Sequence, residues 1–324
     1  MKIQPQYPPS QNVLYRFRNK RRLAILFSLT LEELTALRNN PTYHSFTKSF
    51  RGKKPRLIEK PIGKLDGVHK RIQTLLSRIQ TPSYLFSGKK NTTYIDNASV
   101  HLKSNYFLSL DIEKYYPSTK TEHVFRFFHH IMLMSEDVAW FLADLVTYNG
   151  HIPTGSYLSQ TVAYWSYAPL FNKLFQLAES NDIVFSLYVD DITFSSDKPI
   201  PKSFELEVMN LIYSSELTIK KSKLKKRSKK HFKVVTGVAI TPNKTTLIPN
   251  KLREKIHDTL GKYSDITKVS VEDLDSLIGQ INAARKIEPN YHEMILDKLK
   301  KLNRLIIRER KPRKLRIRQK LHRE

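Results

Sequence analysis

The feature that most constrains this chain is a pair of adjacent aspartates, Asp190 and Asp191, between two strand-like runs. The residues before the pair, 183–187, and those after it, 192–196, are largely apolar or β-branched, which predicts two strands. Two such runs joined through an Asp-Asp pair make a hairpin that presents both carboxylates at its tip. Adjacent acids crowd like charge unless a cation neutralises it, and carboxylate oxygens suit Mg²⁺. An Asp-Asp pair is often only a solvated turn, so the prediction depends on the flanking strands.

A third aspartate, Asp111, ends another apolar run that starts at residue 106. One Asp at a strand end and two on a neighbouring hairpin could together hold two Mg²⁺ ions. Such a pair of ions activates a 3′-hydroxyl and stabilises the pyrophosphate that leaves in an in-line displacement. Taken alone, Asp111 could equally end a strand or cap the segment that follows it.

Three segments in this order resemble the polymerase motifs of reverse transcriptases. "SLDIEKYYPS" resembles their motif A, "IPTGSYLSQ" their motif B, and "YVDDITFS" their motif C with its YxDD signature. The resemblance extends over most of the chain. It implies that Asp111, Asp190 and Asp191 are the metal-binding catalytic residues, and that Ile112 is a further metal ligand.

The same resemblance implies which residues meet the incoming nucleotide. Tyr116 falls where the family places an aromatic ring that collides with a ribonucleotide 2′-hydroxyl. In motif B, Thr154 replaces the usual Gln and Gln160 the usual final Pro. The usual Gln packs beside the nucleotide, so its loss could alter nucleotide handling without removing a metal ligand. Gly155 is kept, either for close backbone approach to the nucleotide or template or as a turn glycine.

Two short elements narrow the resemblance to retron reverse transcriptases. One matches the NAxxH element upstream of motif A, and the other matches the VTG element beyond motif C. The matching residues are Asn97, Ala98 and His101, and Val235, Thr236 and Gly237. In this family both elements are associated with the cognate noncoding RNA, which implies that these residues bind RNA. From the residues alone, Asn97 reads as a turn residue and His101 as a satisfied polar side chain.

The charge of the chain indicates a polyanionic partner. The sequence has 56 Lys plus Arg against 30 Asp plus Glu, a net charge of +26. An excess this large favours nucleic acid as the partner. The segment 220–233 holds nine Lys or Arg and no acid, and the segment 298–324 holds thirteen. Apolar residues at helical spacing within the second segment predict a packed helix with a basic side, on which we expect Arg304 and Arg308 to bind RNA.

Composition sets further bounds on the protein class. With 324 residues and 40% hydrophobic content, the chain can bury a large core. It has no cysteine, which excludes disulfides and thiolate metal sites and fits a reducing bacterial cytoplasm. We expect no membrane segment, because the longest early apolar stretch, 23–31, is too short to cross a bilayer. It runs straight into Glu32 and Glu33, and Thr30 and Glu33 have the spacing of a helix-capping box.

The resemblance implies an α+β fold of the right-hand polymerase type, with a palm made of an antiparallel sheet and helices. We expect N-terminal helices and fingers over 1–105, a palm over 106–232, a hairpin like a primer grip over 233–249, and a basic helical thumb and tail over 250–324. Helices are predicted over 121–148, 161–179, 203–215, 252–262, 270–286 and 291–308, and paired strands over 234–240 and 245–249.

Two groups of basic residues are candidates for contact with the nucleotide. The segment "SFRGKKPRLIEKPIG" resembles the fingers hairpin whose basic side chains hold a triphosphate. Arg56 is the main candidate there, with Lys54 and Lys70 as further candidates, although each lysine could simply be solvated. A lysine of the motif D region commonly serves as the general acid for pyrophosphate in this family. Lys220, Lys221 and Lys223 remain open for that role.

The resemblance implies an RNA-directed DNA polymerase that adds dNTPs with two Mg²⁺ ions. It would copy part of its structured noncoding RNA into single-stranded DNA primed from an internal 2′-hydroxyl, giving a branched RNA–DNA product. It also implies a place in antiphage defence beside a separately encoded effector protein. The alternatives are another defence reverse transcriptase, a group II intron-type enzyme, and a basic RNA-binding scaffold with a vestigial site.

Overall fold

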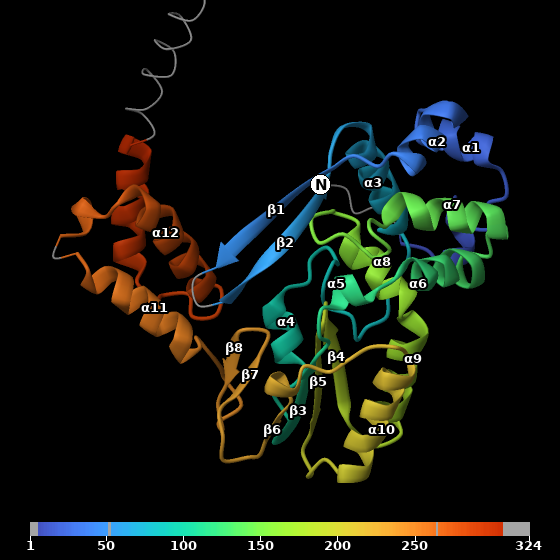
Figure 1. Ribbon diagram of the computed structural model, residues 1–324. Helices are drawn as coiled ribbons and strands as arrows, with labels where there is room; N and C mark the ends of the chain where they lie inside the picture. Colours follow the sequence, from blue (N-terminus) through green and yellow to red (C-terminus); the bar gives the residue numbers. More distant parts are fainter. Residues whose placement is uncertain (1–5, 51–52, 264, 307–324) are drawn as a thin grey trace, which may run out of the picture. The chain divides into compact units, whose positions relative to one another are not determined.

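The computed structural model describes residues 6–50, 53–263 and 265–306, and the chain divides into two compact units (Figure 1). The first unit combines Met1–Thr93 with Ser104–Ser228, and the second combines Tyr94–Lys103 with Lys229–Glu324. The ten-residue segment 94–103 therefore belongs with the C-terminal part of the chain, although it lies between two parts of the first unit in sequence. The assignment of fingers, palm and thumb to ranges of the chain stays a prediction.

The first unit begins with two short helices, a long hairpin and a third helix. These elements are α1 (Lys20–Leu26), α2 (Leu31–Asn39), β1 (Tyr43–Phe50), β2 (Lys53–Pro61) and α3 (Gly63–Leu76). The predicted capping box is confirmed. The Thr30 hydroxyl accepts a hydrogen bond from the Glu33 backbone N–H, and the Glu33 carboxylate accepts one from the Thr30 backbone N–H. The predicted fingers-like hairpin is present as the antiparallel pair β1–β2.

A four-stranded antiparallel sheet forms the centre of the first unit. Its strands lie in the order β4-β5-β3-β6, with β3 (Tyr106–Asp111), β4 (Val184–Tyr188), β5 (Asp191–Ser196) and β6 (Lys225–Arg227). The apolar runs predicted around the Asp-Asp pair are thus strands, and the run that ends at Asp111 is their neighbour. Because β3 pairs with β5, residues 80 positions apart in sequence come together at one end of this sheet.

Helices pack around this sheet and build one continuous hydrophobic core. They are α5 (Tyr115–Ser118), α6 (Thr121–Arg126), α7 (Glu136–Val146), α8 (Ser159–Ser166), α9 (Ala168–Glu179) and α10 (Lys202–Ser214), with a π-helical segment at Phe127–Ile131. In Figure 1, α9 and α10 lie beside the β4–β5 hairpin, and the rings of Phe194 and Phe204 meet edge-on at 5.2 Å. The prediction of a single helix over 161–179 is wrong, because the helix is interrupted at Tyr167 between α8 and α9. Pro169, which lacks a backbone N–H, lies in the first turn of α9.

The second unit has a small sheet, several helices and its own core. Its elements are α4 (Tyr94–Ser99), β7 (Lys233–Val235), β8 (Val238–Ile240), β9 (Thr246–Leu247), α11 (Asn250–Gly261), α12 (Val271–Arg285) and a helical segment over 293–306. The predicted strand over 234–240 is instead a tight hairpin that turns at Thr236 and Gly237. Buried apolar residues of α11, α12 and the last helical segment, among them Leu277 and Leu299, form the second core.

The predicted α+β class with antiparallel sheets is confirmed by these elements. Among the helices of the described residues, we find none with the length and apolar character needed to cross a membrane.

Candidate active site

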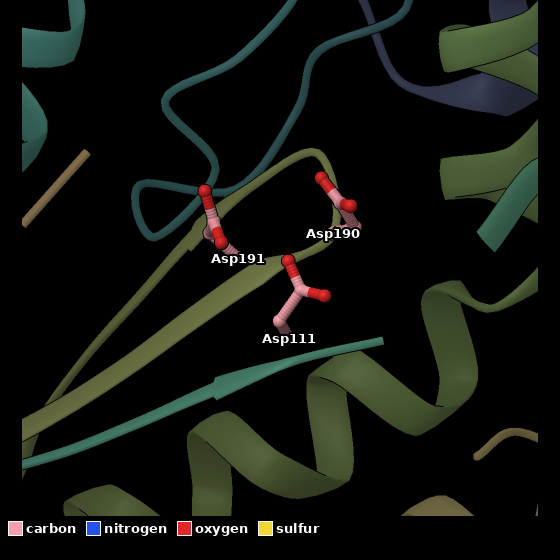
Figure 2. Close-up of side chains that lie close together, drawn as sticks. All are labelled: Asp111, Asp190 and Asp191. Carbon is pink, nitrogen blue, oxygen red and sulfur yellow. The ribbon is translucent and has the colours of Figure 1, made fainter. Parts of the chain in front are cut away.

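The three predicted aspartates lie together at the end of the central sheet (Figure 2). Asp111 is the last residue of β3 and faces Asp191, the first residue of β5, in the strand register. Asp190 belongs to the two-residue loop between β4 and β5, and its backbone oxygen accepts a hydrogen bond from the Ile112 N–H at 3.0 Å. One carboxylate oxygen of each aspartate lies within 4.8 Å of the others. The apolar side chain of Ile112 is buried, so this residue could offer a metal ion only its backbone carbonyl.

Burial and the charges of neighbouring carboxylates raise the pKa values of Asp190 and Asp191. Burial, followed by the nearby Asp111 charge, raises the pKa of Asp190 above its ordinary value. Burial, followed by the Asp190 charge, raises the pKa of Asp191 to about 7, even though 45% of the Asp191 side chain is exposed. A bound cation would remove this repulsion, and all the donors are hard oxygens. The three residues could therefore bind a divalent metal ion.

Lys223 is the lysine of the motif D region that reaches the aspartates. Its ammonium forms an ion pair with the Asp111 carboxylate and lies 3.8 Å from Asp191 Oδ1. The backbone N–H of Lys220 donates to the Asp111 carbonyl at 2.9 Å, which aligns this segment with the end of β3. Burial lowers the pKa of Lys223, but the hydrogen bond to Asp111 and the Asp191 charge outweigh burial and raise it overall. The sequence left Lys220, Lys221 and Lys223 as candidates for the general acid. Among the described residues, Lys223 is the candidate whose ammonium contacts the carboxylates.

The loop that carries Asp190 has a strained backbone. Val189 has φ +59, a left-handed conformation that β-branched residues rarely adopt. Its N–H donates to Ser87 Oγ at 2.9 Å, and the segment before Ser87 runs along β4 through hydrogen bonds between Leu187 and the backbone of Tyr84 and Phe86. Strain of this kind costs roughly 1–3 kcal/mol and persists where the surrounding structure holds it. Here the neighbouring segment holds the loop that presents Asp190.

The two tyrosines after motif A differ in their surroundings. Tyr115 is buried, and its hydroxyl has no hydrogen-bond partner among the described residues. Tyr116 is partly exposed, and burial together with the Asp190 charge raises its pKa to about 12. Its role as a steric gate stays a prediction.

The predicted triphosphate-binding residues have different environments. Arg56 is exposed on β2, and its charge acts to lower the pKa of Asp190, so it lies within electrostatic reach of the site. The side chain of Lys54 lies outside the described residues. Lys70 is exposed on α3, forms an ion pair with Asp66 at 2.7 Å, and lies 5.4 Å from the ring centroid of Tyr157. The contacts of Lys70 are thus with its own helix and with motif B.

Motif B is attached to the fingers-like hairpin through its backbone. Thr154 Oγ1 donates to the Leu57 carbonyl at 2.6 Å, and the Gly155 N–H donates to the Glu59 carbonyl at 3.1 Å. A Cβ at Gly155 would lie 2.7 Å from that same carbonyl oxygen. Gly155 thus makes a close backbone approach to β2. Its approach to the nucleotide or template stays a prediction.

The sequence reasoning missed a second link between these elements. The Glu59 carboxylate is 2% exposed and contacts His151 Nε2 at 3.1 Å. His151 pairs with Tyr148 across a two-residue turn in which Asn149 has φ +52 and Gly150 φ +77. Tyr148 also stacks on Tyr43 of β1 at 4.1 Å. The Asn-Gly dipeptide is a strong turn signal that could have located this turn, but its partner on β2 was not visible in the sequence.

The NAxxH and VTG residues meet inside the second unit. Asn97, Ala98 and His101 are fully buried, and burial lowers the pKa of His101 to about 3, so its ring is neutral. Asn97 Nδ2 donates to Thr236 Oγ1 at 3.2 Å. Val235 is buried, whereas Gly237 is exposed at the turn. The NAxxH residues are therefore buried and joined to the VTG turn by a hydrogen bond, and the binding of RNA by either element stays a prediction.

The basic candidates at the end of the chain lie only partly within the described residues. Arg304 is exposed on the helical segment over 293–306, whose Leu296 and Leu299 are buried, as the helical spacing predicted. Arg308 lies outside the described residues. The binding of RNA by these two residues stays a prediction.

Comparison with known proteins yields several relatives of one kind, although no family model matches the chain. The chain is 33% identical over 168 residues to the Retron Se72 reverse transcriptase of Salmonella heidelberg (strain 579083-10), covering 50% of this chain and 43% of that protein. It is 23% identical over 271 residues to the Retron Ec86 reverse transcriptase of Escherichia coli, covering 81% of this chain and 82% of that protein. The Escherichia coli Retron Ec83 reverse transcriptase is 23% identical over 267 residues, covering 74% and 81%. The chain thus spans less than half of the Se72 protein and about four fifths of the other two.

Among solved structures, the chain is similar to a telomerase from Candida albicans in complex with a fragment of telomeric RNA. The TM-score is 0.47 at 10% identity, covering 79% of this chain and 56% of that one. The sequence relatives confirm the predicted resemblance to retron reverse transcriptases.

Proposed function

We propose that this chain is a retron-type reverse transcriptase, an RNA-directed DNA polymerase that copies part of a structured noncoding RNA into single-stranded DNA. The observation that carries the proposal is the convergence of Asp111, Asp190 and Asp191 within 4.8 Å at the end of an antiparallel sheet. The partners would be the RNA, its RNA-linked DNA product and dNTPs. Priming from an internal 2′-hydroxyl, a role in antiphage defence and a separately encoded effector belong to the same proposal.

The aspartates would hold two Mg²⁺ ions, to which Ile112 would add its carbonyl oxygen. When bound, the ions promote loss of the proton from the primer hydroxyl and neutralise charge on the leaving pyrophosphate. Lys223 places a positive charge beside Asp111 and Asp191, where it could offset charge on the departing group. It is therefore our choice for the motif D lysine.

The nucleotide would lie between the aspartates and the fingers-like hairpin. Arg56 is the proposed triphosphate contact, because it is exposed on β2 and its charge reaches Asp190. Tyr116 would exclude a ribonucleotide 2′-hydroxyl, and Thr154 with Gly155 would form the adjoining wall. Lys54 and Lys70 remain further candidates, with Lys70 drawn toward Asp66.

The test uses nucleic acid that co-purifies with the protein expressed from its own locus. The bound material is extended with labelled dNTPs and Mg²⁺, treated with RNase and resolved on a denaturing gel. We expect a discrete DNA band that shifts after RNase treatment. The double variant Asp190→Asn/Asp191→Asn should retain bound RNA and give no band, because amides are poor cation ligands and carry no charge.

A matched control is Asp182→Asn, which makes the same change at an exposed residue with φ +55, a conformation that Asn tolerates. This variant should give the wild-type band. Heterogeneous DNA whose mobility on the gel is unchanged by RNase would instead indicate polymerisation without an RNA template. Bound RNA with no DNA from the wild-type protein would favour an RNA-binding scaffold.

A further inference from the structure

The loop that carries Asp190 is a tight turn with an unfavourable residue in its first position (Figure 2). Tyr188 and Asp191 pair at the end of the β4–β5 hairpin, so Val189 and Asp190 are the two central residues of the turn. Val189 has φ +59, whereas Asp190 is not among the residues with positive φ. A two-residue turn of this kind favours glycine in its first position, because β-branched residues rarely adopt positive φ. The conformation of the turn therefore depends on a contact from outside the hairpin.

Ser87 makes that contact through its hydroxyl. The Val189 N–H donates to Ser87 Oγ at 2.9 Å, and Ser87 is 4% exposed. This N–H belongs to the peptide between Tyr188 and Val189, which begins the turn. The orientation of this peptide sets the direction in which the chain enters Asp190, and the hydrogen bond fixes it from outside the hairpin. Ser87 thus acts on the residue directly before a predicted metal ligand.

The segment before Ser87 is fixed to β4, which gives the Ser87 hydroxyl a rigid base. The Leu187 N–H of β4 donates to the Tyr84 carbonyl at 2.8 Å, and the Leu187 carbonyl accepts from the Phe86 N–H at 3.0 Å. A parallel bridge pairs Leu85 with Leu187, and both side chains are buried. The segment therefore lies along β4 in the manner of a further short strand. Ser87 follows it directly, so its hydroxyl lies at the level of the turn.

A residue of motif B lies against the glycine that follows Ser87. Gly88 has φ +70, and a Cβ added there would lie 2.9 Å from Gln160 Nε2. Gln160 lies in the first turn of α8, at the position where motif B usually has proline. Together with Ser87 and Tyr164, it helps to line a cavity of about 30 Å³. The departure from the usual motif therefore places a side chain against the segment that holds the Asp190 turn.

We propose that Ser87 is a positioning residue that fixes the direction of the Asp190 carboxylate toward the other two aspartates, with Gln160 as its support. Ser87 itself contacts neither the metal ions nor the nucleotide. The inference rests on the proposed function, in which the aspartates hold the metal ions of the reaction. It predicts that loss of the Ser87 hydroxyl weakens cation binding and lowers kcat. A merely structural contact would lower the melting temperature without changing the cation affinity of the folded protein.

The main variant is Ser87→Ala, which leaves the Val189 N–H without its acceptor. Binding of Mn²⁺ is measured from the electron paramagnetic resonance signal of the free ion. The amount bound by the double variant Asp190→Asn/Asp191→Asn is subtracted, which removes Mn²⁺ held elsewhere, including on co-purified RNA. We expect Ser87→Ala to weaken the remaining Mn²⁺ affinity and to lower kcat for extension of oligo(dT) on poly(rA), each about tenfold.

The same change in a Val189→Gly background separates the turn from other effects of Ser87. Glycine adopts positive φ without strain, so the turn would no longer depend on the Ser87 hydroxyl. Adding Ser87→Ala to Val189→Gly should therefore cost less than about twofold in Mn²⁺ affinity or in kcat. Equal losses in the two backgrounds would overturn the proposal, because Ser87 would then act by a route other than the turn.

Gln160→Ala tests the support of Ser87. It should give a smaller loss of about threefold, and no additional loss when it is combined with Ser87→Ala. A matched control is Ser83→Ala, at an exposed position of the same segment, which should leave Mn²⁺ affinity, kcat and the melting temperature unchanged.

A folded Ser87→Ala variant with wild-type Mn²⁺ affinity and kcat would contradict the proposed positioning role. A wild-type protein that copies no template would count against the proposed polymerase. The comparison of Mn²⁺ binding between the wild type and Ser87→Ala would in that case still test the positioning of Asp190.

Discussion

At the scale of single residues, the protonation of Asp191 is a measurable property of the site. Burial and the Asp190 charge raise its pKa from 3.8 to about 7 in the folded protein. Between these values the folded protein binds a proton that the unfolded chain has lost, so stability falls as pH rises. With a chelator present to remove metal ions, we expect the wild-type melting temperature to fall relative to that of Asp191→Asn as the pH rises from about 5 to about 7.5. This range covers the loss of the proton from Asp191 in the folded protein.

The control for this prediction is Asp182→Asn, whose exposed side chain should leave the pH dependence unchanged. Adding Mg²⁺ at about pH 7.5 should raise the wild-type melting temperature and leave that of Asp191→Asn nearly unaffected. The reason is that the cation competes with the proton for the Asp191 carboxylate near neutral pH. Identical pH profiles for the wild type and Asp191→Asn would show that this carboxyl is not perturbed.

Gly155 gives a second prediction at this scale. In Gly155→Ala the new Cβ would lie 2.7 Å from the Glu59 carbonyl oxygen, and that backbone belongs to β2. Either motif B or the hairpin must move, at a cost of about 1–3 kcal/mol in stability. We expect a lower melting temperature and a raised KM for dNTPs in steady-state extension. Gly261→Ala, on α11 with no atom within 4 Å of the added Cβ, is the control and should be neutral or stabilising.

At the scale of elements, the link between the fingers-like hairpin and motif B gives a prediction for the Glu59 and His151 pair. Glu59→Gln should retain one hydrogen bond to His151, whereas Glu59→Ala leaves the histidine without its acidic partner. We expect Glu59→Ala to lose about 2 kcal/mol of stability. It should also raise the KM for dNTPs more than it lowers kcat. The proposed nucleotide contacts at Thr154 and Gly155 would become less ordered, while the aspartates would keep their positions.

A double-mutant cycle with His151→Ala measures whether the pair acts as a unit. The double variant should be destabilised by clearly less than the sum of the two single changes, with a coupling energy of about 1 kcal/mol. Glu207→Ala, at an exposed position of α10, is the control for loss of an acid in the first unit. Additive effects at Glu59 and His151 would mean that the two residues are independent.

At the scale of the whole molecule, the net charge of +26 predicts how RNA binding responds to salt. Each phosphate neutralised releases counterions, so the affinity falls steeply as salt rises. With about six or more phosphate contacts, we expect a loss of roughly a thousandfold between about 50 and 200 mM salt. Filter binding or fluorescence anisotropy over this range would measure the slope. A flat salt dependence would mean that base and shape contacts dominate.

The sequence alone determined the parts of the protein that depend on local pattern. The strands around Asp190 and Asp191, the capping box at Thr30 and the basic character of residues 220–233 all follow from neighbouring residues, and the structure contains them. The three aspartates could also be chosen in advance, because their motifs are short and contiguous. Periodicity and turn chemistry act over a few residues, which is the range that a sequence displays directly.

Only the tertiary structure decided which distant residues meet. The register of β3 with β5 brings Asp111 beside Asp191, and the choice of Lys223 among three lysines depends on where its segment packs. Thr236 in the VTG turn is a case in which tertiary structure overrides local preference, because a threonine rarely adopts positive φ. Its hydrogen bonds to Tyr94 and Asn97 come from a helix far earlier in the chain. Long-range contacts of this kind can override local preference, because several packed groups together outweigh the small cost at a single residue.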